Sequence, residues 1–314
     1  MGKLAILCSG QGSQKPGMGT SFRDDASVDE VFEAASDMCG FDVFAACGSE
    51  TALSDASKVQ PALCAASIAA ARALASEGVV ADAVAGFSLG QVAALNVAGM
   101  LSLEDTFALC AARANAMAAV AVHAPGAMCA LMGADEQSVA ALIAQVSQGA
   151  VLVAANYNAP GQIVVSGERD AVVRAAEAWR GPGRRATMLA VAGAFHSPLM
   201  QDAADELASF LKGVRFQEPR IPLICNVDAR PLSASDAAEH MVRQVVSPVL
   251  FDRSVAYLRE MGVDAYAECG SGAVLCGLAR RAHEESRRFA IGSKEDACAL
   301  AHERAGSLPG KDYQ

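Results

Sequence analysis

The segment Gly86-Phe87-Ser88-Leu89-Gly90 places one serine between two glycines, and it is the only G-x-S-x-G in the chain. A serine on a strained strand-to-helix turn needs small neighbours, because larger side chains would collide with the sheet and the helix. At a helix N-terminus the helix dipole also favours an alkoxide and the oxyanion that follows its attack. Five residues can match by chance in a glycine-rich chain, but here a strand is predicted before the motif and a helix after it. The pattern therefore indicates Ser88 as a nucleophile.

A serine nucleophile needs a base, and the chain has five histidines, at positions 123, 196, 240, 283 and 302. His196 lies in Ala194-Phe195-His196-Ser197-Pro198, on a loop between a predicted strand and a predicted helix, where catalytic groups often lie. The other four lie among charged helical residues, near the tail or at a predicted domain boundary. Position alone favours His196 as the base without deciding the matter.

Arg113 lies in a predicted helix over residues 103–120, among small and mostly apolar neighbours. A guanidinium on such a face is costly to bury unless it meets a carboxylate, and its planar fork suits two-point pairing. The carboxylate could belong to a ligand or to an internal salt bridge, or the side chain could reach water along the helix surface. The residues themselves leave these alternatives open.

The segment Gly10-Gln11-Gly12-Ser13-Gln14 follows the first predicted strand. Its glycines would let backbone N–H groups approach an anion. It matches neither the phosphate-loop nor the dinucleotide-binding pattern, so taken alone it is better interpreted as a turn.

The elements that must position these residues alternate between strands and helices. The predicted strands are 4–8, 82–86, 223–225 and 265–268, and the predicted helices are 60–77, one from about 91, 103–120, 201–211 and 251–261. Such alternation predicts an α/β fold with a largely parallel sheet. From residue 294 onward we expect weak helix and a frayed end.

Residues 124–193 have a different pattern. Strands are predicted at 127–132, 151–155, 162–166 and 186–191, with helices at 135–148 and 169–180. The order β-α-β-β-α-β is the ferredoxin-like pattern. We therefore expect a large α/β domain made of residues 1–123 and 194–314, with a small ferredoxin-like domain, 124–193, inserted as one wall of a cleft.

Composition narrows the class of protein. A net charge of −10 argues against nucleic acid as a partner, although a local basic pocket could still hold an anionic ligand. None of the ten cysteines has C-x-x-C spacing, so we expect buried thiols in a reducing cytosol and no metal site. No signal peptide is evident, and no stretch looks long and apolar enough to span a membrane, which predicts a cytoplasmic protein.

Taken together, the motifs resemble the malonyl-CoA:acyl carrier protein transacylases and the related acyltransferase domains of polyketide and fatty acid synthases. The segments that carry the resemblance are residues 10–14, 86–90, Arg113, Asn158-Ala159-Pro160-Gly161-Gln162, 194–197, and Gln244 with Ser247-Pro248-Val249. They occur in the family's order and spacing, from about Leu4 to Arg281. The resemblance implies an α/β-hydrolase-like core, malonyl-CoA and acyl carrier protein as partners, and no cofactor.

The resemblance also implies a role for each matching residue. Ser88 would carry the malonyl group as an ester and His196 would act as general base and then acid. The backbone N–H groups of Gln11 and Leu89 would form the oxyanion hole. Arg113 would bind the free malonyl carboxylate, and the backbone carbonyl of Gln244 would orient the imidazole in place of an acid.

Two positions depart from the family pattern, since Phe87 and Gln91 stand where a histidine and a glutamate are common. Phe87 would lie beside the acyl pocket and influence the choice of acyl unit. Phe195 resembles the malonyl-type subset, because a bulky side chain there leaves less room for an α-methyl group. Arg280, Arg281, Arg287, Arg288 and Lys294 form the densest basic group for docking an acidic carrier, or else a solvated helix face.

Three other functions compete. An editing acyl hydrolase on the same fold would have no carboxylate for Arg113 to bind. An ordinary esterase should show an acid between its serine and histidine and an HGGG-type loop, and neither is evident. A non-catalytic carrier-binding module would not need both Ser88 and His196 at this spacing.

Overall fold

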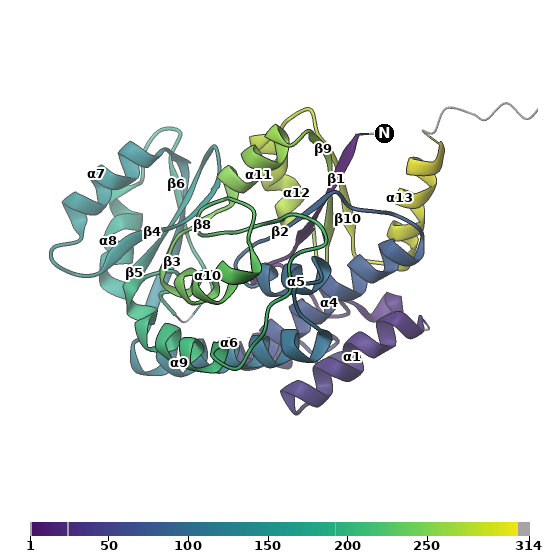
Figure 1. Cartoon of the computed structure of the whole chain (residues 1–314). Coiled ribbons are helices and arrows are strands. Elements are labelled where there is room, and N and C mark those ends of the chain that lie inside the picture. Colours follow the sequence, from purple (N-terminus) through teal and green to yellow (C-terminus); the bar gives the residue numbers. More distant parts are fainter. Residues whose placement is uncertain (1, 24, 192, 307–314) are drawn as a thin grey trace, which may run out of the picture.

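The computed structural model describes residues 2–23, 25–191 and 193–306, and Figure 1 shows two sheets with helices packed around them. The larger sheet has the strand order β10-β9-β1-β2-β7, and every neighbouring pair is parallel. Its strands are β1 (Lys3–Cys8), β2 (Ala83–Gly86), β7 (Leu223–Ile224), β9 (Val263–Cys269) and β10 (Arg287–Ile291). The α/β fold with a parallel sheet that the sequence predicts is confirmed.

Helices cover both faces of this sheet, and β1 shows why. Its side chains alternate between faces, as they must in a strand. Leu4 and Ile6 belong to the main hydrophobic core, whereas Ala5 and Leu7 belong to a second, smaller core. The main core contains residues of α1 (Ala26–Cys39), α4 (Ala56–Ser76), α5 (Gly90–Val97), α6 (Leu103–His123), α9 (Gln201–Leu211) and α10 (Ala234–Val246); the second contains those of α11 (Phe251–Glu260) and α12 (Val274–Ala282).

The smaller sheet is mixed, with the strand order β6-β3-β5-β4-β8. Its strands are β3 (Gly126–Ala134), β4 (Leu152–Ala159), β5 (Gly161–Glu168), β6 (Arg185–Met188) and β8 (Val249–Leu250). The first four pair antiparallel, and β8 joins β4 in parallel from far along the chain. Helices α7 (Glu136–Val146) and α8 (Arg169–Ala178) pack on one face with Trp179, whose indole N–H donates to the Met132 carbonyl at 2.9 Å.

Several predicted boundaries were wrong. Helix α4 begins at Ala56 and not at residue 60, because Asp55 caps it by accepting from the Ser57 N–H, so Pro61 lies inside the helix. Strands β4 and β5 extend toward each other, so most of the predicted loop at 156–161 is strand. The sequence analysis gave no bounds for α10 and α12, although it placed His240 and His283 among helical residues. It missed α1, β8, β10 and the short helices α2 (Val43–Cys47) and α3 (Glu50–Ser54).

The predicted C-terminal helix is α13 (Lys294–Gly306), and the frayed end expected beyond it lies outside the described residues. The expectation that no segment could span a membrane needs correction. Helices α4 and α6, each 21 residues long, are apolar enough to do so by length and composition. Most of the apolar stretch of α4 and half of that of α6 are buried inside the protein, as in core helices.

The turn between β2 and α5 depends on two glycines that allow close backbone contact. A Cβ atom on Gly90 would lie 2.0 Å from the Cys8 carbonyl oxygen at the end of β1, and one on Gly86 would lie 2.0 Å from the Gly90 carbonyl carbon. Backbone atoms on both sides leave little room to relax. These glycines let helix α5 start directly against the ends of β1 and β2.

We therefore expect Gly90→Ala to lower the free energy of unfolding by at least about 3 kcal/mol, because the new methyl group meets backbone. Gly277→Ala is the matched control, since Gly277 lies inside α12 with no atom near the position of its missing Cβ. In a helix interior that change should stabilise by up to about 1 kcal/mol. Urea unfolding of both variants measures the difference, and equal midpoints would contradict the proposed contact.

Candidate active site

Ser88 lies in the turn between β2 and α5 with a φ of 54°, a left-handed conformation that non-glycine residues seldom adopt. Asn226 holds this conformation from two sides. Its Oδ1 accepts from the Ser88 N–H at 2.8 Å, and its Nδ2 donates to the Gly86 carbonyl at 2.7 Å. The Gln244 side chain donates to the Ser88 carbonyl at 3.0 Å and to Asn226 Oδ1 at 3.1 Å. Two amide side chains thus fix the backbone on which the hydroxyl is presented.

His196 is buried beside Ser88, and its Nε2 lies 2.7 Å from Ser88 Oγ. Its Nδ1 lies 2.8 Å from the backbone carbonyl oxygen of Gln244. A carbonyl can only accept, so Nδ1 carries the hydrogen and Nε2 is left to accept from the serine hydroxyl. His196 also has a positive φ, 59°, which is a second strained backbone position at this point. The arrangement suits deprotonation of Ser88 with a carbonyl as the orienting group.

Electrostatics keep the imidazole neutral. Burial, and then the positive charge of Arg113, lower the pKa of His196 to about 4, against the smaller opposing effect of the carbonyls of Gln244 and Ser247. Above that pH the ring is unprotonated and available as a base.

Arg113 is fully buried in α6, with 1% of its surface exposed. Its Nη1 donates to Gln60 Oε1 at 2.6 Å, and its Nη2 donates to Ser88 Oγ and Gln244 Oε1, both at 3.3 Å. Its Nε has no hydrogen-bond partner among the described residues. Every partner is a neutral oxygen, and no ion pair is formed by Arg113 with any described carboxylate.

Burial lowers the pKa of Arg113 to about 10, so the guanidinium is still charged at neutral pH. An unpaired charge inside a protein is costly, and an anion at the Nε–Nη2 edge would remove that cost. Of the alternatives open for Arg113, an internal salt bridge and a surface position are therefore both excluded within the described residues.

The turn at residues 10–12 lies against the Ser88 turn. A Cβ atom on Gly10 would lie 2.4 Å from the Phe87 carbonyl oxygen, which shows how closely the two backbones approach. Within the described part of the chain, the backbone N–H groups of Gln11 and Leu89 donate to no acceptor. Two free donors beside a serine hydroxyl are what an oxyanion hole requires.

A groove of about 400 Å³ runs between the two sheets beside this centre. Its lining includes Phe87, Gln11, Asn158, Gln162, Val191 and Leu278. The Phe87 ring packs edge-on against Phe251, with 5.4 Å between the ring centroids. Asn158 lines the groove, and its side-chain oxygen is buried without a hydrogen-bond partner among the described residues. Phe195, in contrast, is buried in the main core and is not among the residues that line the groove.

Two site residues were missed by the sequence analysis, Asn226 and Gln60. Asn226 follows the short strand β7 at its C-terminal end, where functional groups gather in parallel sheets, and this position could have revealed it. Gln60 faces Arg113 from α4, and nothing in its sequence surroundings distinguishes it. The cavity of about 670 Å³ at the N-terminal end of β2 is lined by none of the site residues Ser88, His196, Arg113, Gln60, Asn226 and Gln244.

Comparison with known proteins gives a consistent result. The profile of the acyl transferase domain family matches residues 6–301. The malonyl CoA-acyl carrier protein transacylase of Escherichia coli K12 is 37% identical over 290 residues, covering 90% of this chain and 93% of that protein. Its Bacillus subtilis counterpart is 34% identical over 303 residues, covering 94% and 95%.

Solved structures agree with the sequence comparison. The malonyl CoA-acyl carrier protein transacylase of Coxiella burnetii superimposes with a TM-score of 0.92 at 31% identity, over 96% of this chain and 97% of that one. A malonyl-transacylase in complex with its type II polyketide synthase acyl carrier protein superimposes with a TM-score of 0.91 at 34% identity, over 96% and 99%.

The buried imidazole makes a prediction about pH. Reaction of Ser88 with a fluorophosphonate should be half-maximal near pH 4 rather than near 6.5, because the lowered pKa of His196 keeps it unprotonated. Arg113→Met removes a charge that lowers this pKa, so its half-maximum should move to higher pH. The measurement is labelling rate against pH, with Ser88→Ala as the unlabelled control. A midpoint at 6.5 in the unchanged protein would contradict the assignment.

Proposed function

This chain belongs to the acyl transferase domain family, and from that premise we propose that it transfers a malonyl group from malonyl-CoA to the phosphopantetheine thiol of an acyl carrier protein. The observation that carries this proposal is Arg113, a buried guanidinium that pairs with none of the described carboxylates and whose Nη2 lies 3.3 Å from Ser88 Oγ. Malonyl-CoA brings both a thioester for Ser88 and a carboxylate for Arg113.

In the proposed first step, Ser88 Oγ attacks the thioester carbonyl while His196 Nε2 takes the hydroxyl proton. The N–H groups of Gln11 and Leu89 stabilise the oxyanion. The carbon–sulfur bond then breaks, and coenzyme A leaves as the thiol with the proton from His196. In the second step the carrier thiol gives its proton to His196 and attacks the malonyl-serine ester, and Ser88 recovers a proton as it leaves.

The free carboxylate of the malonyl group would bind the edge of Arg113 formed by Nε and Nη2. Nε lacks a partner and Nη2 makes only long contacts, whereas Nη1 is held by Gln60 at 2.6 Å. That edge offers two parallel N–H donors, which match the two oxygens of a carboxylate. Neutralising Arg113 would also remove a charge that lowers the pKa of His196, so substrate binding would make the base stronger.

The groove would hold the pantetheine arm, which coenzyme A and carrier protein share. Its two amide groups could donate to the free side-chain oxygen of Asn158. Phe87 narrows the groove beside the elbow, where the family commonly has a histidine, and we propose that it influences which acyl groups are accepted. Phe195 would influence the shape of the groove indirectly, by packing in the core, because it does not line the groove itself.

The same arrangement argues against the other functions. An editing hydrolase for simple acyl chains would leave the Arg113 charge unpaired in every complex. An esterase acid between Ser88 and His196 is absent from the described contacts of His196, whose Nδ1 meets a carbonyl.

We also propose the finer architecture. Residues 1–123 and 194–314 would form an α/β-hydrolase-like domain, and 124–193 a ferredoxin-like domain. In support, β3, α7, β4, β5, α8 and β6 follow in the ferredoxin-like order, and the sheet order β6-β3-β5-β4 is antiparallel throughout. A cytoplasmic location fits such an enzyme.

Arg113→Ala is the decisive substitution. It should lower kcat/KM for malonyl-CoA by about 100-fold or more, because the substrate carboxylate would be buried without a partner, at a cost of about 3–5 kcal/mol. Transfer of an acetyl group, which has no carboxylate, should be equal or improved. The measurement is kcat/KM for both substrates with one carrier protein.

Two controls accompany that experiment. Arg113→Lys should rescue little, because an ammonium cannot make the planar two-point contact. Ser88→Ala should trap no labelled malonyl ester at all. If both substrates lose activity equally in Arg113→Ala, the side chain is structural and malonyl specificity has another source.

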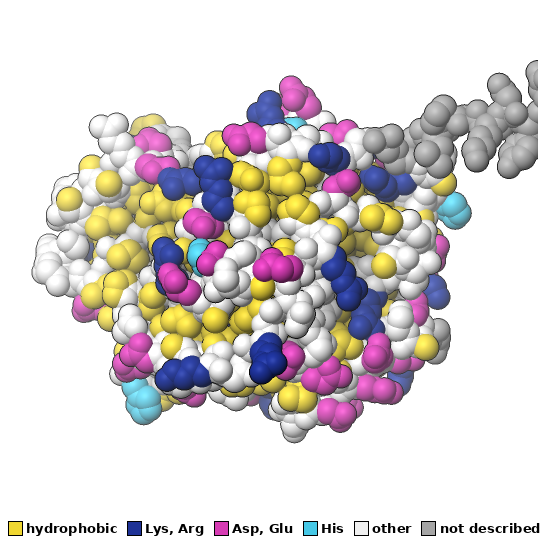
Figure 2. All heavy atoms as spheres, in the orientation of Figure 1, with side chains coloured by type: hydrophobic (Ala, Val, Ile, Leu, Met, Phe, Trp, Pro, Cys, Tyr) yellow, Lys and Arg dark blue, Asp and Glu magenta, His cyan; other side chains and the backbone are white. Residues whose placement is uncertain are grey.

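The basic group expected to dock the carrier is smaller than the sequence suggests. Arg287 pairs with Asp264 and Glu303, and Arg288 donates to the carbonyls of His283 and Glu284. Arg280 and Arg281 remain exposed, and Arg281 donates to Gln162 at the groove. On the face seen in Figure 2 acidic and basic side chains are interspersed.

Reversing both charges, Arg280→Glu with Arg281→Glu, should raise the KM for an acidic carrier protein several-fold and flatten its salt dependence. Malonyl-CoA hydrolysis without carrier should not change. Arg169→Glu with Arg180→Glu, at exposed positions at the ends of α8, is the matched control for the change in net charge. A carrier KM that is the same in both double variants would remove this surface from the docking site.

A further inference from the structure

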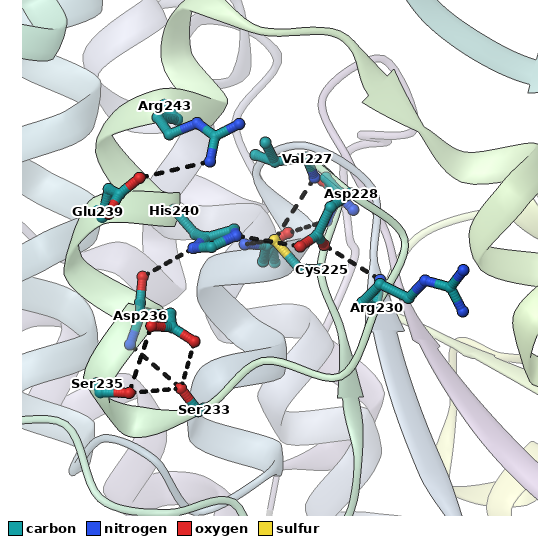
Figure 3. Close-up of polar contacts among 12 residues, drawn as sticks. Cys225, Val227, Asp228, Arg230, Ser233, Ser235, Asp236, Glu239, His240 and Arg243 are labelled. Atoms are coloured by element: carbon teal, nitrogen blue, oxygen red, sulfur yellow. Dashed lines mark hydrogen bonds and ion pairs between the residues drawn. The ribbon is translucent and has the colours of Figure 1, made fainter.

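Three side chains of metal-binding type meet outside the groove, where the turn after β7 faces α10 (Figure 3). The ligand atoms of Cys225, Asp228 and His240 all lie within 4.8 Å of one another. We propose that these three residues bind one zinc ion, with water as the fourth ligand. The inference goes beyond the proposed acyl transfer and does not depend on it.

The turn itself brings two of the ligands together. Cys225 N–H donates to the Arg230 carbonyl at 2.9 Å, and Ala229 N–H donates to the Cys225 carbonyl at 3.0 Å. Ala229 has a φ of 56°, an uncommon conformation for a residue with a side chain. This tight turn presents Cys225 and Asp228 toward His240, whose ring points to them from α10 in Figure 3.

The imidazole is oriented for coordination. His240 Nδ1 lies 3.0 Å from the Asp236 carbonyl oxygen, so it carries the hydrogen and leaves the Nε2 lone pair directed at Asp228. Asp228 Oδ1 accepts from the Arg230 N–H at 3.1 Å, which leaves Oδ2 for another partner. Fixing each ligand through its second polar atom is the usual arrangement around a bound metal.

The distance between the two free atoms fits a bridging cation. His240 Nε2 and Asp228 Oδ2 are 3.2 Å apart, and two lone pairs at this distance repel unless a proton or a cation lies between them. Tetrahedral zinc bonds of about 2.0–2.2 Å separate a nitrogen and an oxygen ligand by about 3.3 Å. The sulfur ligand would lie about 3.5 Å from both atoms in such a complex, and Cys225 Sγ already lies within 4.8 Å of them.

The sulfur makes this a site for a thiophilic ion. The Val227 N–H and the Gln91 side-chain amide donate to Cys225 Sγ at 3.5 and 3.6 Å. Hydrogen bonds donated to the sulfur favour its thiolate form. Zinc binds cysteine as the thiolate, so the incoming ion displaces the thiol proton. Thiolate, imidazole and one carboxylate together select zinc over magnesium or calcium.

The position of the site gives it a role. Cys225 is followed by Asn226, which holds the Ser88 backbone, and His240 lies one helical turn before Gln244, whose carbonyl orients His196. A zinc ion joining Cys225 to His240 would therefore clamp the two elements that align nucleophile and base. It would act as a positioning site and would not touch substrate.

The test uses the full chain without a histidine tag, stripped with a chelator and titrated with Co²⁺ and then Zn²⁺. One Co²⁺ per chain should bind and give the near-ultraviolet charge-transfer band of a cobalt–thiolate bond, and Zn²⁺ should displace it. His240→Ala and Asp228→Asn, at accessible positions, should each weaken Zn²⁺ binding by at least about 100-fold. Cys225→Ala should remove the thiolate band.

The matched controls are His302→Ala and Cys298→Ser, which change the same residue types elsewhere and should bind as the unchanged chain does. Zn²⁺ should also raise the midpoint of thermal unfolding of the unchanged chain and of both controls, but not of His240→Ala. Absence of saturable binding at micromolar Zn²⁺, or equal binding by His240→Ala, would overturn the proposal. So would a cobalt complex without the thiolate band.

Discussion

The catalytic centre depends on a serine held in a backbone conformation that a serine does not prefer. The left-handed turn at Ser88 exists because two glycines allow backbone to touch backbone, and because Asn226 takes up both the N–H and the carbonyl that the turn leaves free. Strain of this kind costs of order 1–3 kcal/mol and persists only where the surroundings fix it. Here the surroundings are the ends of β1 and β2 and the turn after β7.

Amide groups, rather than acids, complete the site. Gln60, Gln244 and Asn226 satisfy the polar atoms of Arg113 and Ser88 without contributing negative charge. A carboxylate in place of Gln60 or Gln244 would neutralise Arg113 and compete with an anionic substrate. It would also raise the pKa of His196 in the free protein. The choice of neutral partners thus leaves a cation and a neutral base side by side until an anion arrives.

The Ser88 turn was predictable from the sequence, whereas contacts between residues far apart in the chain were not. The Ser88 turn combines local motif and predicted context, so its position and type were correct. The sequence could not decide whether Arg113 binds a ligand, forms an internal salt bridge or lies on the surface. The decision depends on which carboxylates lie near it in the folded protein, and sequence patterns do not give those distances. The bounds of helix α10 were not predicted, although the resemblance implied that the Gln244 carbonyl within it orients the imidazole of His196. The cysteines were all interpreted as buried thiols, because none has C-x-x-C spacing. The cluster of Cys225, Asp228 and His240 joins residues of a turn and of a separate helix, so no sequence spacing reveals it.

The pairing of β1 with β9 has a consequence for how the chain acquires this fold. Leu4 is aligned with Ala265, so the centre of the larger sheet joins segments that lie far apart in the sequence. Until β9 has left the ribosome, one edge of the apolar β1 has no hydrogen-bonding partner, and unpaired edges of this kind invite association with other chains. Such distant contacts also slow folding, because a long loop must close before they form. The central strand of the nascent protein therefore stays half paired until β9 has been made, a stage at which molecular chaperones can act.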